Sequence, residues 1–138
     1  MLQERKKCRV FVVDDEYFIA STLASILSLQ GFDAFSFTEP LEALRAARNE
    51  APDLLISDVV MPLVSGIELA VRVLQLCPNC KILLFSGEAA TSSMLEIART
   101  NGHNFEVLTK PVHPSDLLSK IREAVFEPSA HAAAELIV

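Results

Sequence analysis

The chain has 138 residues, 51% of them hydrophobic, and a formal net charge of -6 from twelve basic and eighteen acidic residues. This length gives one domain with a proper core, and the acidic balance argues against direct nucleic-acid binding, because phosphate neutralisation needs a basic surface. No apolar run approaches the roughly 18 residues of a membrane helix, and residues 1–7 are charged and lack the apolar region of a signal peptide. The sequence therefore predicts a soluble, cytoplasmic protein.

The apolar residues predict five strands alternating with five helices. Strands are expected at residues 8–13, 32–37, 53–58, 81–86 and 105–109. Helices are expected at 16–30, with Gly31 as C-cap, and from the N-cap Thr38 to near Asn49. The third is expected from Ile67 until Pro78 stops it, the fourth at 89–100, and the last has Pro114 in its first turn and a buried stripe that reaches Val125. Short connections and right-handed crossovers make this an α/β fold with a parallel sheet covered on both faces.

Polar side chains follow several of these strands where each ends. Asp14 and Asp15 follow the first strand, Asp58 ends the third, Ser86 ends the fourth, and Lys110 follows the fifth. Ligands bind at the carboxyl ends of strands in open α/β sheets, so we expect these side chains to converge. Carboxylates brought together repel one another unless a hard cation such as Mg²⁺ lies between them. With a lysine and a hydroxyl beside it, Asp58 on the central strand is the best candidate for a nucleophile in phosphoryl transfer.

The cysteines do not predict a redox or zinc site. Cys77 and Cys80 match C-x-x-C, but they follow a helical pattern and lead into a strand, whereas the redox motif opens a helix. Zinc needs about four ligands, and the histidines are scattered singly at His103, His113 and His131. We therefore interpret these residues and Cys8 as structural.

Four motifs in order resemble the receiver domain of two-component response regulators. They are Val12-Val13-Asp14-Asp15-Glu16, Asp58-Val59-Val60-Met61-Pro62 with Gly66, Ser86-Gly87, and Lys110-Pro111. The resemblance covers residues 8–126, leaving residues 1–7 as an N-terminal extension and residues 127–138 as a C-terminal tail or linker. It implies a doubly wound, flavodoxin-like sandwich with a five-stranded parallel sheet in the order 2-1-3-4-5, the order that such folds commonly show.

The resemblance also implies the chemistry of the acidic residues. Asp58 would accept a phosphoryl group from a sensor histidine kinase or a histidine phosphotransfer protein. Mg²⁺ would be bound by Asp58, directly by Asp15, through water by Asp14, and by the carbonyl of Val60. The domain would assist its own phosphorylation and dephosphorylation without being an enzyme.

The resemblance also implies how the domain would respond to phosphorylation and which surfaces would bind partners. Lys110 would pair with the phosphoryl oxygens, Ser86 would hydrogen-bond one of them, and the Lys110–Pro111 peptide bond would be cis. A downstream protein would bind the face made by residues 89–126, and a homodimer is compatible with the family. Glu88 would either affect water access to an acyl phosphate or be an ordinary loop charge.

The sequence departs from the family pattern at the switch residue. Receivers usually carry Tyr or Phe three residues before the lysine, where this chain has Val107, and the nearest aromatic is Phe105. Either Phe105 is displaced by a bulge and still serves, or loop and helix shifts alone convey the switch. This departure supports a competing hypothesis, an interaction module that works without phosphorylation.

A phosphohydrolase and a flavin-binding protein are weaker hypotheses for the function. A phosphohydrolase of the haloacid-dehalogenase type needs an acid two residues after its nucleophile, where this chain has Val60. A flavin-binding protein is compatible with the topology alone, which does not determine function.

Overall fold

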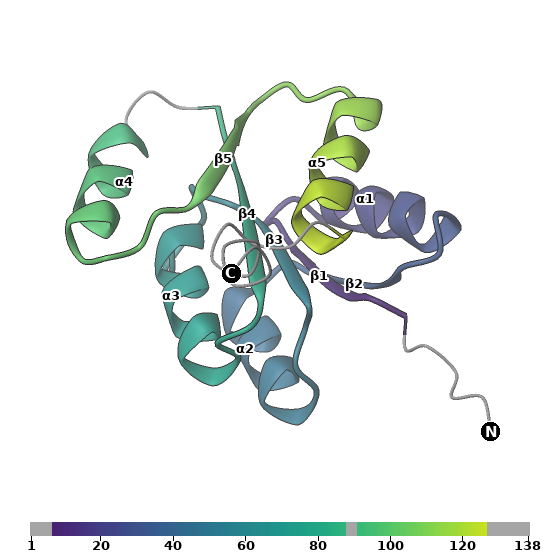
Figure 1. The fold of residues 1–138 in the computed structure, drawn as a ribbon, viewed down its shortest axis with the longest axis horizontal. Coiled ribbons are helices and arrows are strands. Elements are labelled where there is room, and N and C mark those ends of the chain that lie inside the picture. Colours follow the sequence, from purple (N-terminus) through teal and green to yellow (C-terminus); the bar gives the residue numbers. More distant parts are fainter. Residues whose placement is uncertain (1–6, 88–90, 127–138) are drawn as a thin grey trace, which may run out of the picture.

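The computed structural model describes residues 7–87 and 91–126, and these form a three-layer α/β sandwich (Figure 1). Its strands are β1 (Arg9–Val13), β2 (Asp33–Phe37), β3 (Leu54–Asp58), β4 (Lys81–Ser86) and β5 (Glu106–Thr109). Its helices are α1 (Tyr17–Leu29), α2 (Pro40–Asn49), α3 (Gly66–Leu76), α4 (Thr91–Thr100) and α5 (Pro114–Phe126). The predicted alternation of strand and helix is confirmed.

The five strands form one parallel sheet in the order β2-β1-β3-β4-β5, as predicted. The register sets Asp58 of β3 beside Phe85 of β4, and Ser86 of β4 beside Thr109 of β5. The last residues of the three strands therefore lie along one edge of the sheet, where parallel strands open toward ligands.

The core lies on both faces of the sheet because successive strand residues point to opposite sides. Phe11 and Leu55 pack with α2 and α3 on one face, while Val12 and Ile56 pack with α1 and α5 on the other. These central strands are buried on both sides, which explains why β1 and β3 are apolar without alternation. A third cluster joins the start of α3 to α4 around Val59.

Helix ends follow the expected capping chemistry with one correction. Gly31 takes a positive φ of 95° just after α1, as predicted from its C-capping role. The N-cap of α2 is Glu39, not the predicted Thr38, because Pro40 occupies the first helical position. Proline suits that position since its fixed φ fits the helix and its missing N–H needs no partner there. The prediction that α4 begins at residue 89 falls on residues 88–90, which lie outside the described residues.

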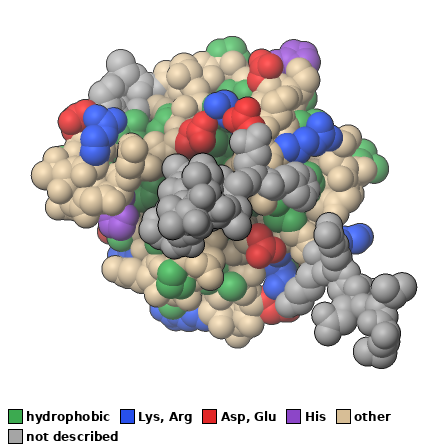
Figure 2. Space-filling view, in the orientation of Figure 1, with side chains coloured by type: hydrophobic (Ala, Val, Ile, Leu, Met, Phe, Trp, Pro, Cys, Tyr) green, Lys and Arg blue, Asp and Glu red, His purple; other side chains and the backbone are tan. Residues whose placement is uncertain are grey.

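The surface carries charges of both signs. On the face shown in Figure 2, Lys and Arg side chains lie next to Asp and Glu side chains and do not gather into one stripe. None of the described helices is long and apolar enough to cross a bilayer.

Candidate functional site

Three carboxylates meet where β1 and β3 end. Asp14, Asp15 and Asp58 each place one oxygen within 4.8 Å of the oxygens of the other two. Asp14 is only 3% exposed, Asp58 is partly buried, and Asp15 is exposed to solvent. The structure therefore confirms the predicted convergence of the strand ends.

The surroundings of Asp14 make its negative charge unfavourable. Burial raises the pKa of the Asp14 carboxyl above its usual range, and the charges of Asp58 and Asp15 raise that pKa further. Two interactions lower the pKa of Asp14 instead. The backbone N–H of Glu16 donates a hydrogen bond to Asp14 Oδ1 at 2.9 Å, and Lys110 supplies a positive charge. The negative charge of the three carboxylates therefore exceeds the positive charge that the neighbouring side chains supply.

Lys110 supplies the positive charge that faces these acids. Its Nζ donates a hydrogen bond to Asp58 Oδ2 at 3.1 Å and lies 3.8 Å from Asp14 Oδ2. The backbone N–H of Lys110 donates to the carbonyl of Ser86 at 3.0 Å, which ties the end of β5 to the end of β4. The Lys110–Pro111 peptide bond is cis, as the resemblance implied.

Ser86 and Val60 lie at the same edge of the sheet. Ser86 is the last residue of β4 and is buried, with 7% of its surface exposed. Val60 follows Asp58 by two residues and is 52% exposed, which is high for a valine. All six predicted site residues are therefore carried by the ends of β1, β3, β4 and β5, while Glu88 lies outside the described residues.

Two neighbours of Asp58 position its backbone, and this role was not predicted from the sequence. Ser57 is fully buried, and its Oγ donates a hydrogen bond to the Asp58 carbonyl oxygen at 2.9 Å. Gly66, at the start of α3, lies against that same carbonyl, and a Cβ atom there would overlap it. A polar residue inside an apolar strand was the signal that marked Ser57.

The donor set fits a hard divalent cation. Three carboxylates that share a volume a few ångströms wide offer oxygen ligands only, the kind that Mg²⁺ and Ca²⁺ take in preference to softer metals. A cation there would also offset the unfavourable burial of Asp14. Within residues 7–87 and 91–126, no other group of three or more His, Cys, Asp or Glu side chains comes this close.

The residues around the missing switch aromatic have distinct environments. Val107 is half-buried in β5, opposite Leu84 of β4, and packs against the cluster around Val59. Phe105 precedes β5, and its ring stacks on His103 with centroids 5.6 Å apart. The two hypotheses for the switch both stay predictions.

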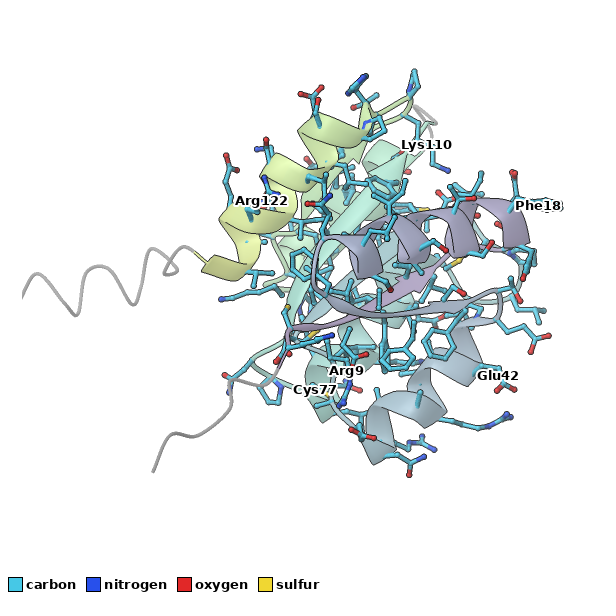
Figure 3. The ribbon with its side chains drawn as sticks, turned by 90° about the vertical axis from the view of Figure 1, so that its right-hand side faces the viewer. Arg9, Phe18, Glu42, Cys77, Lys110 and Arg122 are labelled. Atoms are coloured by element: carbon cyan, nitrogen blue, oxygen red, sulfur yellow. The ribbon has the colours of Figure 1, made fainter. Side chains whose placement is uncertain are left out.

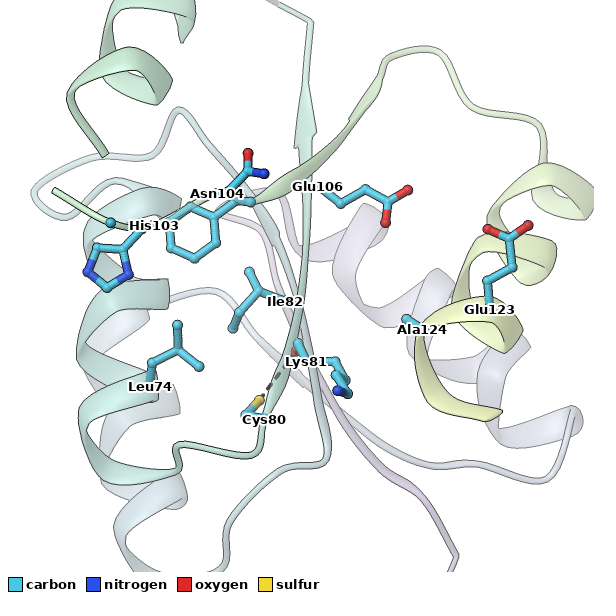
Figure 4. A pocket seen from close by; sticks show the side chains of 11 residues that line it. Leu74, Cys80, Lys81, Ile82, His103, Asn104, Glu106, Glu123 and Ala124 are labelled. Carbon is cyan, nitrogen blue, oxygen red and sulfur yellow. Dashed lines mark hydrogen bonds between the residues drawn. The ribbon is translucent and has the colours of Figure 1, made fainter. Parts of the chain in front are cut away.

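The cysteines take structural positions. Cys77 and Cys80 lie in the turn between α3 and β4, where both are buried in the core, and Cys80 Sγ donates to the carbonyl of Lys81 (Figure 4). Burial raises the pKa of the Cys80 thiol to about 12 and that of Cys8 to about 11. A thiol that resists ionisation is a poor nucleophile and a poor metal ligand.

Comparison with known proteins identifies the class to which this fold and site belong. The family model described as the response regulator receiver domain matches residues 10–122. The chain belongs to that family.

Several relatives are similar over most of the chain. The chemotaxis protein CheY of Thermotoga maritima is 27% identical over 116 residues, which is 83% of this chain and 95% of that protein. The transcriptional regulatory protein CreB of Escherichia coli is 31% identical over 113 residues, or 82% of this chain, but the match spans only about half (48%) of CreB. A crystal structure of a CheY-like receiver domain protein from Methanospirillum hungatei superposes with a TM-score of 0.79 at 30% identity, covering 88% of this chain and 96% of that one.

Proposed function

We propose that this chain is a phosphoacceptor switch of a cytoplasmic two-component pathway, in which Asp58 accepts a phosphoryl group from a histidine kinase or a histidine phosphotransfer protein. The observation that carries the proposal is that Asp58 lies 3.1 Å from Lys110 Nζ and shares one site with the carboxylates of Asp14 and Asp15. Membership of the receiver family supports the same function.

The chemistry assigned to Asp58 is nucleophilic displacement at phosphorus. A carboxylate oxygen of Asp58 forms a bond to phosphorus as the bond from phosphorus to the donor imidazole nitrogen breaks, and the departing imidazole takes up a proton. The product is an acyl phosphate on Asp58. Because Asp58 is consumed and regenerated on the chain itself, we propose a self-assisting phosphoacceptor and not an enzyme acting on a separate substrate.

The remaining side chains would serve the same transfer. Lys110 would neutralise an oxygen of the incoming phosphoryl group, and the Ser86 hydroxyl would donate a hydrogen bond to another. Asp15 and Asp14, with the Val60 carbonyl, would hold Mg²⁺, which when bound supplies positive charge at the phosphoryl oxygens. Phosphorylation would then redistribute two conformations, and a downstream protein would bind one of them through residues 89–126.

A module that signals without phosphorylation is the second candidate, favoured by Val107 at the switch position. Intact-mass measurement after incubation with Mg²⁺ and acetyl phosphate separates the two. We expect the wild-type chain and an Asp33→Asn control, altered at the opposite end of the sheet, to gain one phosphoryl group, and Asp58→Asn to gain none. A wild-type chain that stays unmodified with acetyl phosphate and with its kinase would favour the second candidate.

A further inference from the structure

A large apolar groove runs between α1 and α5, beside the acidic site. Its volume is about 750 Å³, and it is lined by Phe18 and Ile19 from α1 and by Leu117 and Leu118 from α5, with Lys110 at its margin. Phe18 is 84% exposed and lies at the first turn of α1, on the side of the molecule where Lys110 lies (Figure 3). A concave site of this volume, lined mostly by apolar side chains, is typical of the places where ligands and peptide segments bind.

A hydrogen bond connects α1 and α5 at the end of the groove that lies away from Lys110. Arg122 of α5 donates from Nη2 to Oε1 of Gln30, the C-cap of α1, at 3.3 Å. The two helices are therefore connected away from the acidic site, while the groove reaches Lys110 at its other end. A peptide segment bound in the groove would lie along α5, with one end beside Lys110 and the acidic site.

The chain itself carries a segment of matching length and polarity. Residues 127–138 follow α5 directly, and Pro128 cannot continue that helix, so the chain can turn there. Of the nine residues after Ser129, only His131 and Glu135 are polar, and they are four apart, which places both on one side of a helix. The other seven are Ala, Leu, Ile or Val.

The distances allow this segment to return along α5. From Phe126 back to Leu117 is nine residues, or about 14 Å at the rise of an α-helix. Nine residues after the turn cover about the same 14 Å if helical, and the whole twelve-residue segment spans up to about 40 Å if extended. A connection of three residues between antiparallel helices is an ordinary length.

We infer that residues 127–138 fold back over α5 and occupy the α1–α5 groove of the same chain, with the apolar residues near Ile137 against Phe18. This docking does not depend on the proposed phosphoacceptor function.

The chain contains no tryptophan, so one introduced tryptophan reports on this contact without interference. The variant Ile137→Trp places the probe on the tail, and Leu29→Trp, at a residue that is 86% exposed, gives the emission of a fully hydrated indole. The expected result is emission at shorter wavelength and weaker acrylamide quenching for Ile137→Trp. Adding Phe18→Asp should return both signals to the exposed reference, while Ser25→Asp, on an exposed position of α1 outside the groove, should not.

Two results would overturn the inference. The first is a tryptophan emission spectrum of Ile137→Trp that equals that of the Leu29→Trp reference, or that does not change when Phe18→Asp is added. The other is a blue-shifted spectrum that is lost on dilution as sedimentation shows a dimer dissociating, since the tail would then occupy the groove of a second copy. Neither measurement involves phosphate or Mg²⁺, so a failure here is separate from a failure of the phosphoacceptor proposal.

Discussion

Gly66 packs so closely on Asp58 that a Cβ atom at residue 66 would overlap the Asp58 carbonyl oxygen, which also accepts a hydrogen bond from Ser57 Oγ. Gly66→Ala should therefore destabilise the chain, even though alanine is favoured over glycine in a helix by about 1 kcal/mol. Backbone overlap of this kind costs typically about 1–3 kcal/mol, and it cannot be relieved by a rotamer change. We expect a lower midpoint in urea unfolding and slower labelling of Asp58 by acetyl phosphate.

Gly87→Ala is the matched control at the same edge of the sheet. A Cβ atom there would meet Lys110 Cβ at 3.5 Å, an ordinary contact distance. Its urea midpoint should stay close to that of the wild-type chain. If both alanine variants lose the same stability, the contact with Asp58 is not what makes glycine necessary at residue 66.

The ion pair of Lys110 with Asp58 leads to a prediction about rate. Lys110→Ala removes the one cation within reach of these carboxylates in the described part of the chain, so the incoming phosphoryl group would lose a charged hydrogen bond. Such a bond is worth about 1.5–3 kcal/mol, which corresponds to roughly 10- to 150-fold in rate. The initial rate of Asp58 phosphorylation by acetyl phosphate should fall by about that factor, with the far-UV circular dichroism of a folded domain retained.

Lys120→Ala serves as the control because Lys120 Nζ pairs with Glu106 at 3.0 Å on the surface, away from the acidic site. Its phosphorylation rate should match that of the wild-type chain. An unfolded Lys110→Ala spectrum would contradict the view that this lysine acts on the transfer and is dispensable for folding.

The crowding of Asp14, Asp15 and Asp58 predicts that Mg²⁺ stabilises the folded chain. A ligand that binds only the folded state raises its free energy of unfolding in proportion to the logarithm of its concentration. The thermal midpoint should rise with Mg²⁺ for the wild-type chain and for Asp33→Asn, and should rise much less for Asp15→Asn, which removes an exposed ligand without emptying the core. Equal shifts in all three proteins would mean that Mg²⁺ acts elsewhere.

The alternation of strands and helices could be predicted from sequence because it depends on short-range pattern. Apolar runs that end in Asp14 or Asp58 mark where buried strands stop, but the strand order that makes β1 and β3 neighbours was implied by the family resemblance and not by local pattern. Likewise Gly31 signals the end of α1 by the backbone conformation that it alone adopts easily.

Features that depend on how distant elements pack could not be predicted in this way. The groove between Phe18 and Leu118 exists because two helices about a hundred residues apart lie side by side on one face of the sheet. The need for glycine at residue 66 arises from the distance between α3 and the end of β3, which no local pattern encodes. The start of α2 at Pro40 shows a local competition, in which the fixed φ of proline prevailed over the capping hydroxyl of Thr38.

The three cysteines give a prediction about pH. Burial is the main cause that raises the pKa of each thiol above the ordinary value of 9.0, to about 11 for Cys8 and about 12 for Cys80. Thiols in the folded chain should therefore react slowly with an alkylating reagent such as iodoacetamide up to pH 9, whereas the same chain in denaturant should react at three sites.

The same shifts fix the sign of the alkaline stability change. Above pH 9 the unfolded chain loses its thiol protons while the folded chain keeps them, so the free energy of unfolding should fall from about pH 9 toward pH 11–12. Cys80→Ala removes the most strongly shifted thiol, and its urea midpoint should decline less steeply over that interval than that of the wild-type chain. Rapid alkylation of Cys77 or Cys80 in the folded chain at pH 7, located by peptide mapping, would instead show that the turn between α3 and β4 opens readily, and would contradict the structural role assigned to these two residues.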